Sequence, residues 1–133
     1  MKYILIVCLV IAVGCKTRHE NTNFEYNISE NPWIDAFKDQ VFFNCLRESY
    51  SDRKVFEIIE KYDAFNPYDG LDSENIILAK KLGEEISKNI PPPIMCDGCK
   101  GGQNYFMATC LHYYASKELD SIAKAEYKKF TGK

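Results

Sequence analysis

The stretch Met107–Asp120 constrains the fold of this chain most strongly, because it contains a helix end, a helix start and a cysteine inside an apolar pattern. Residues at i, i+3, i+4 and i+7 form one face of an α-helix, and here they are Met107, Cys110, Leu111 and Tyr114. Ser116 follows as an N-cap, since its hydroxyl can accept a hydrogen bond from a free backbone N–H of the next turn. The stretch therefore predicts two helices joined by a tight corner, the first packed on a core.

Apolar residues at helical spacing predict three helices before this stretch. The first begins at Asn31-Pro32, a good N-cap followed by a residue that suits the first turn, and it ends near Tyr50. The next two are expected at Asp52–Tyr62, and from Asp72 or Ser73 to the run Pro91–Pro93. The side chains of the second helix expected to face the core are Val55, Phe56, Ile58 and Ile59.

A fifth helix is predicted to follow Ser116, along the stripe Leu119, Ile122, Ala123, Tyr127 and Phe130. Gly83 is expected to weaken the third helix by about 1 kcal/mol relative to alanine. No segment shows the sustained alternation of a half-buried strand. The predicted fold class is therefore all-α: a compact, disulfide-stapled bundle of about five helices, preceded by a signal peptide and a flexible tether.

The N-terminus predicts export. Lys2 precedes the apolar run Tyr3–Val13, which is too short to cross a hydrocarbon core of about 30 Å but suits a secretory signal. The small residues before Cys15 are typical of a bacterial lipoprotein cleavage box, so Cys15 is expected to carry lipid; an ordinary secretory signal is the alternative. We thus divide the chain into a signal peptide (1–14), a lipidated N-terminus with a tether (15–31) and a helical domain (32–133), held in the periplasm at the outer membrane.

The charge of the mature chain argues against nucleic acid as a partner. Removing residues 1–14 takes one lysine from the 17 Lys+Arg and leaves 16 against 19 Asp+Glu, a net charge of about −3. A nucleic-acid-binding domain usually carries a basic patch or stripe, and this sequence has none. A polar segment such as 15–31 would have a root-mean-square reach of roughly 20–25 Å, which would keep the domain close to the membrane.

Four cysteines remain in the mature chain beyond Cys15, and four cysteines allow three pairings. Export makes disulfides the expected state. Cys45 and Cys110 each lie inside an apolar helical face, so a bond between them would join the first and fourth helices through the core. Cys96 and Cys99 would then close a short ring in the loop after the prolines.

Two other roles for these cysteines are less favoured. A redox role for Cys96-X-X-Cys99 would need a helix N-terminus to stabilise the thiolate, whereas prolines and glycines surround this motif. A zinc site would need Cys96, Cys99, Cys110 and His112 to converge. Positions 110 and 112 of a helix point about 200° apart, so they do not reach one metal easily. We expect neither a metal nor a cofactor.

The common catalytic signatures are also missing from the sequence. There is no Gly-X-Ser-X-Gly, no His-Glu-X-X-His and no glycine loop that would cradle phosphate before a helix. Only His19 and His112 are available as histidine bases, and His19 falls in the predicted tether. The chain is therefore not expected to be an enzyme.

Two segments resemble the family of type VI secretion amidase immunity proteins. They are Phe43-Asn44-Cys45-Leu46, with Tyr50-Ser51-Asp52 downstream, and Met107–Asp120. Members of this family are small exported helical proteins that neutralise a peptidoglycan-cleaving amidase in the periplasm. The similarity covers most of the chain from Phe37 to Lys129 and is dense only at those two places. It implies a helical fold and a Cys45–Cys110 bridge.

The resemblance also implies inhibition by plugging, in which a dimer presents loops and helix ends to the groove of a cognate amidase. The candidate surfaces are 64–72 and 94–105, which combine tyrosine, acidic groups and forced turns. The candidate contact residues are Tyr68, Asp69, Asp97, Asn104 and Tyr105. The alternatives are a periplasmic lipoprotein with a thiol redox role and a structural envelope lipoprotein.

Overall fold

The computed structural model describes residues 30–63, 70–92 and 103–132, and within these ranges the chain forms five helices and no strand. The helices are α2 (Pro32–Ser49), α3 (Lys54–Tyr62), α4 (Ser73–Lys88), α5 (Phe106–Tyr114) and α6 (Lys117–Thr131). This confirms the predicted all-α class. Cys15 and the predicted signal peptide lie outside the described residues, as does most of the tether.

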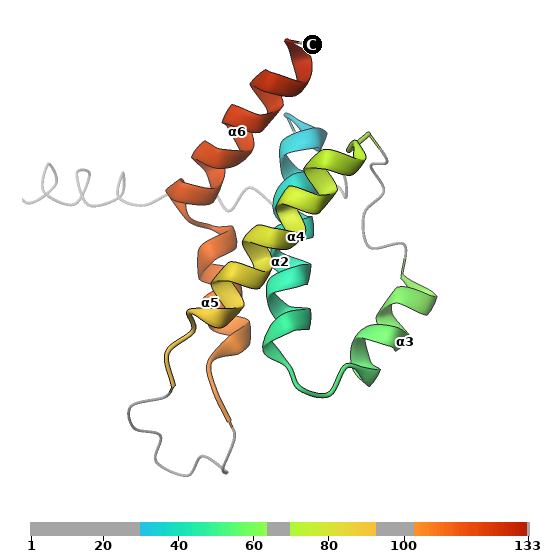
Figure 1. Ribbon diagram of the computed structural model, residues 1–133, viewed down its shortest axis with the longest axis vertical. Helices are drawn as coiled ribbons and strands as arrows, with labels where there is room; N and C mark the ends of the chain where they lie inside the picture. Colours follow the sequence, from blue (N-terminus) through green and yellow to red (C-terminus); the bar gives the residue numbers. More distant parts are fainter. Residues whose placement is uncertain (1–29, 64–69, 93–102, 133) are drawn as a thin grey trace, which may run out of the picture.

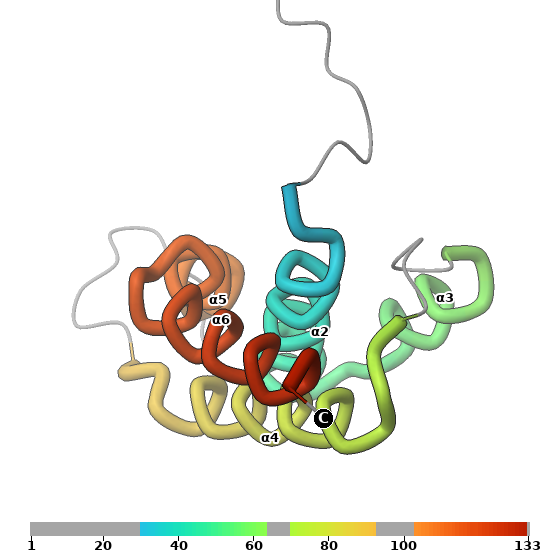
Figure 2. The backbone as a smooth tube through the Cα atoms, turned by 90° about the horizontal axis from the view of Figure 1, so that it is seen from above, coloured from blue at the N-terminus to red at the C-terminus, as the bar shows by residue number. Residues whose placement is uncertain are grey.

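Helix α2 is the centre of the fold, and α4, α5 and α6 all pack against it (Figure 1). Seen from above, α5 and α6 lie on one side of α2 and α3 lies on the other, with α4 running beneath (Figure 2). The main core gathers fully buried side chains from α2, α4 and α6: Trp33, Phe37, Val41, Ala79, Leu119 and Ala123. Among the described helices, none is long and apolar enough to cross a membrane.

The starts of α2, α4 and α6 follow from short polar side chains, as the sequence predicts. Asn31 Oδ1 accepts a hydrogen bond from the N–H of Ile34 at 3.2 Å, and Pro32 fills the first position of α2. Asp72 caps α4, and Ser116 caps α6 through a bond from the N–H of Leu119 at 3.1 Å. These interactions satisfy backbone donors that a helix cannot pair internally. The tight corner between α5 and α6 is thereby confirmed.

Helix α3 departs from its predicted start and orientation. It begins at Lys54, and Asp52 instead accepts a hydrogen bond from the Lys54 N–H at 3.0 Å in the turn before the helix. Phe56 is buried as predicted, but Val55 is 50% exposed and Ile58 is 59% exposed. The prediction that these two residues face the core is wrong, because α3 contacts the rest of the molecule through Phe56, the partly buried Ile59 and Glu60, which lie on another side of the helix.

The predicted inner face of α5 is also only partly correct. Cys110 is 1% exposed and Tyr114 is half-buried, whereas Met107 and Leu111 are 52% and 50% exposed. The short helix is attached through the line of Phe106, Cys110 and Tyr114, which turns the Met107–Leu111 side towards solvent. Periodicity marks the apolar residues of such a helix, but the packing on α2 selects which of them are covered.

Candidate interaction surface

A disulfide between Cys45 of α2 and Cys110 of α5 fixes the end of the molecule that contains the candidate surface. The Cα atoms of the two residues are 5.8 Å apart, within the usual range of about 4.4–6.8 Å, and both side chains are 1% exposed. This confirms the predicted bridge. Because Cys110 is consumed by the disulfide, it cannot serve as a thiolate ligand for zinc.

A chain of aromatic contacts continues from the disulfide to the surface. The Phe43 and Phe56 rings have centroids 5.8 Å apart, Tyr50 lies 5.9 Å from Phe56, and Tyr50 lies 5.3 Å from Phe106. Such pairs stabilise beyond the area they bury, by roughly 0.5–1.5 kcal/mol each. Tyr50, at the C-terminal end of α2, therefore joins the start of α5 to α3, and it remains 37% exposed.

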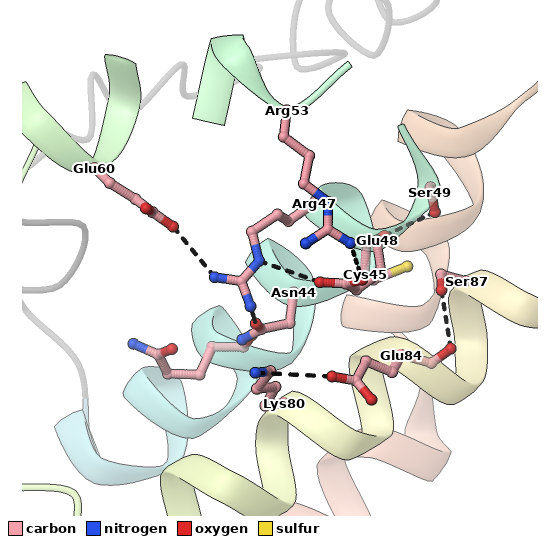
Figure 3. A network of polar contacts seen from close by, with 11 residues as sticks. Asn44, Cys45, Arg47, Glu48, Ser49, Arg53, Glu60, Lys80, Glu84 and Ser87 are labelled. Carbon is pink, nitrogen blue, oxygen red and sulfur yellow. Dashed lines mark hydrogen bonds and ion pairs between the residues drawn. The ribbon is translucent and has the colours of Figure 1, made fainter. Parts of the chain in front are cut away.

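A polar network around Arg47 holds α3 against α2 (Figure 3). Arg47 donates to Glu60 of α3 at 3.2 Å and to Asn44 Oδ1 at 2.7 Å. Arg53, just before α3, donates to Glu48 at 2.6 Å. Glu60 and Arg53 are largely exposed, so we expect each pair to contribute less than about 1 kcal/mol. The network orients α3 more than it stabilises the fold.

Exposed apolar and aromatic groups gather where α5 begins. Tyr105 is 53% exposed and precedes the helix, and its backbone N–H donates to Asn104 Oδ1 at 2.7 Å. Met107 follows in the first turn, and Phe106 lies between them against Tyr50. We call this set, Tyr50, Asn104, Tyr105, Phe106 and Met107, the α5 entrance.

The α5 entrance contains two of the five predicted contact residues, Asn104 and Tyr105. The other three, Tyr68, Asp69 and Asp97, lie outside the described residues, as do Cys96 and Cys99. The contribution of Tyr50 and Phe106 to this surface was not predicted from the sequence. Both are aromatic residues at the ends of predicted helices. Such a position makes each residue a candidate for a surface contact, but the sequence does not show that the two residues contact each other.

A second polar contact joins α2 and α5 on another part of the surface. Asp39 and Tyr114 are hydrogen-bonded, and Lys38 Nζ lies 4.9 Å from the centre of the Tyr114 ring. Burial raises the pKa of the Asp39 carboxyl, an effect that the hydrogen bond from Tyr114 opposes. Burial, followed by the nearby carboxylates of Asp39 and Asp35, raises the pKa of Tyr114 to about 12.

The raised pKa of Tyr114 gives a testable pH dependence. Its phenol should ionise near pH 12 in the folded protein but near 10.0 when unfolded, so the folded state holds the proton more tightly. The stability from this group is therefore complete below pH 10 and is lost as the pH rises towards 12. Subtracting the ultraviolet titration curve of Tyr114→Phe from that of the wild type isolates the phenol, and a midpoint near 10 would contradict the assignment. Asp39→Asn should lower the midpoint.

An open hollow lies between α4 and α6. Its lining residues are Glu74, Asn75, Leu78, Glu126, Lys129 and Phe130. Lys129 already donates to Glu126 at 2.5 Å, and the lining offers no serine, cysteine or histidine as a nucleophile or base. In the described part of the chain, no group of histidine, cysteine and carboxylate side chains is placed to hold a metal ion.

Comparison of the chain with protein families, with curated proteins and with solved structures finds no match.

Proposed function

We propose that this chain is an immunity protein that binds a type VI secretion peptidoglycan amidase in the periplasm and inhibits it by occluding its active-site groove. The proposal rests first on the resemblance at Phe43–Leu46 and Met107–Asp120. The structural observation that supports it best is the α5 entrance, an exposed aromatic end built directly on a buried disulfide. In this function the chain excludes substrate and performs no chemical step.

The physical basis for inhibition is a rigid surface that carries an aromatic anchor. Tyrosine is enriched among residues that dominate binding energy, because it combines a large apolar area with a polar tip. The Cys45–Cys110 bond and the Tyr50–Phe106 contact hold the start of α5 in place before binding. A surface that is ordered in advance loses less conformational entropy on binding, so more of the contact energy contributes to affinity.

The partners in this proposal are the cognate amidase, a second copy of the chain and the membrane. Lipid on Cys15 would hold the domain at the outer membrane, where an incoming amidase would meet it. The most direct test is co-expression of the chain with periplasmic amidase effectors, scored for rescue from lysis. If the chain does not protect cells from an amidase that is encoded beside it, the proposal is contradicted.

With a cognate amidase in hand, Tyr105→Ala should weaken binding at least tenfold, about 1.4 kcal/mol, as measured by calorimetry. Tyr105 is 53% exposed in the free protein, so its removal should leave the fold intact. Tyr62→Ala is the matched control, because this tyrosine is 77% exposed on α3 and lies outside the α5 entrance. Tyr68→Ala tests the rival surface at 64–72. If folded Tyr105→Ala binds as tightly as the wild type, the occluding surface lies elsewhere.

A further inference from the structure

Helix α3 presents an apolar stripe that the rest of the described chain leaves largely uncovered. Val55, Ile58 and Tyr62 follow at i, i+3 and i+7, and they are 50%, 59% and 77% exposed. The helix stands at the side of the bundle, away from α5 and α6 (Figures 1 and 2). It is anchored through Phe56, which packs on Phe43 and Tyr50, and through the Arg47–Glu60 pair.

The charges of α3 are distributed around this stripe in a definite way. At about 100° per residue, Lys54 and Lys61 fall within about 60° of Ile58, so they border the stripe on the side away from Phe56. Both lysines are exposed, and neither forms an ion pair with another described residue. The carboxylates lie farther round the helix: Glu60 is held by Arg47, and the exposed Glu57 lies about 100° from Ile58, beyond the two lysines.

We propose that this stripe of α3 rests on the surface of a phospholipid bilayer. An apolar face bordered by lysines is the arrangement of a helix that lies in a membrane interface. The lysine stems can run along the apolar surface while their ammonium groups reach headgroup phosphates. Tyr62 suits the same boundary, because its ring is apolar and its hydroxyl is polar. Lys61 Nζ lies 5.1 Å from the centre of that ring, so charge and aromatic surface already adjoin.

This inference depends on the proposed membrane-proximal location of the chain. A nine-residue helix with three exposed apolar side chains would bind a bilayer weakly on its own. The segment 15–31, predicted to carry lipid on Cys15, would strengthen this weak binding, because it would keep the domain within roughly 20–25 Å of the membrane surface. Contact of α3 with lipid then becomes an intramolecular step with a high effective concentration. The consequence is a fixed orientation, in which the stripe faces the bilayer and the α5 entrance stays free for a protein partner.

The test places a tryptophan in the stripe and measures its contact with lipid. The mature chain with Cys15→Ser is attached by an N-terminal histidine tag to vesicles containing nickel-chelating lipid, phosphatidylethanolamine and phosphatidylglycerol with brominated acyl chains. Ile58→Trp should lose about half of its emission to the bromines, whereas Leu111→Trp should lose little. Leu111 is 50% exposed on α5 and is the matched control, and the native Trp33 is 1% exposed and gives a constant background.

Lys54→Gln with Lys61→Gln should weaken the quenching of the Ile58→Trp chain, and Glu57→Gln should not. Equal quenching at positions 58 and 111, or none at position 58, would overturn it. If folded Ile58→Ser instead loses affinity for the amidase, the stripe is a protein-docking face and the inference also fails. Because the tag replaces the lipid, the result does not depend on acylation: absence of fatty-acid labelling at Cys15 in cells would contradict the proposed location alone.

Discussion

Replacement of both Cys45 and Cys110 by serine is expected to lower the free energy of unfolding by about 4 kcal/mol. The bridge joins positions 65 residues apart, so it closes a long loop and removes much of the conformational freedom of the unfolded chain. A domain of about 100 residues is stable by only about 5–15 kcal/mol, so the loss takes a large share of the total. Folding at growth temperature would be marginal.

Urea denaturation followed by circular dichroism measures this loss. The alanine pair, Cys45→Ala with Cys110→Ala, is the control, because each cysteine is 1% exposed and a serine hydroxyl there adds a desolvation cost. The alanine pair should retain most of the loss, since the missing covalent link is common to both variants. A decrease below about 1 kcal/mol in both would show that the bridge contributes little to stability.

The starts of α2, α4 and α6 could be predicted from sequence because local chemistry determines them, whereas α3, which has no side-chain cap, begins at Lys54 instead of the predicted Asp52. Asn31, Asp72 and Ser116 each act on a backbone group three residues ahead, and the chain needs no tertiary information to place them. The stripe of α6 was also predictable, because a helix of several turns with one apolar face has one way to bury it, and Leu119 and Ala123 are buried as expected.

The orientation of the short helices could not be predicted in the same way. Each of α3 and α5 has nine residues and several apolar positions, and only Phe56 in one and Cys110 in the other are buried. Contacts with α2 decide which of their apolar residues stay exposed: Phe56 and the Arg47–Glu60 pair hold α3, and the Cys45–Cys110 disulfide holds α5. These are tertiary constraints, and they leave apolar side chains exposed that the helical pattern alone would predict to be buried.

The candidate site was predictable in kind but not in composition. Tyr105 could be identified as an exposed aromatic residue near a loop, whereas Tyr50, which contacts the adjacent Phe106, comes from a helix end 56 positions before Phe106 in the sequence. Periodicity does not pair such distant residues. The disulfide is the exception, because few cysteines are available and the pairing could be enumerated.

Gly83 is the position where sequence and structure lead to opposite predictions of stability. Helix propensity alone predicts that Gly83→Ala should stabilise α4 by about 1 kcal/mol. In the structure, a Cβ atom at this position would lie 2.7 Å from the Cys45 backbone nitrogen, 2.7 Å from the Val41 carbonyl oxygen and 2.8 Å from Asn44 Cβ. Glycine therefore allows α4 to pack directly on the backbone of α2.

We expect Gly83→Ala to lower the free energy of unfolding by about 2 kcal/mol, because overpacking costs roughly 1–3 kcal/mol or more and exceeds the gain in propensity. The atoms in the way are mostly backbone of α2, so they cannot rotate aside, and the two helices must separate beside the disulfide. The midpoint of thermal unfolding should fall by about 10 °C for a domain of this size.

Lys81→Ala is the matched control, since Lys81 is exposed on the same helix and its replacement should change stability by less than about 0.5 kcal/mol. Gly83→Leu should be far more damaging than Gly83→Ala, because every added atom enlarges the clash with α2. A higher midpoint for Gly83→Ala would mean that propensity outweighs the close approach, and it would contradict the packing of α4 against α2.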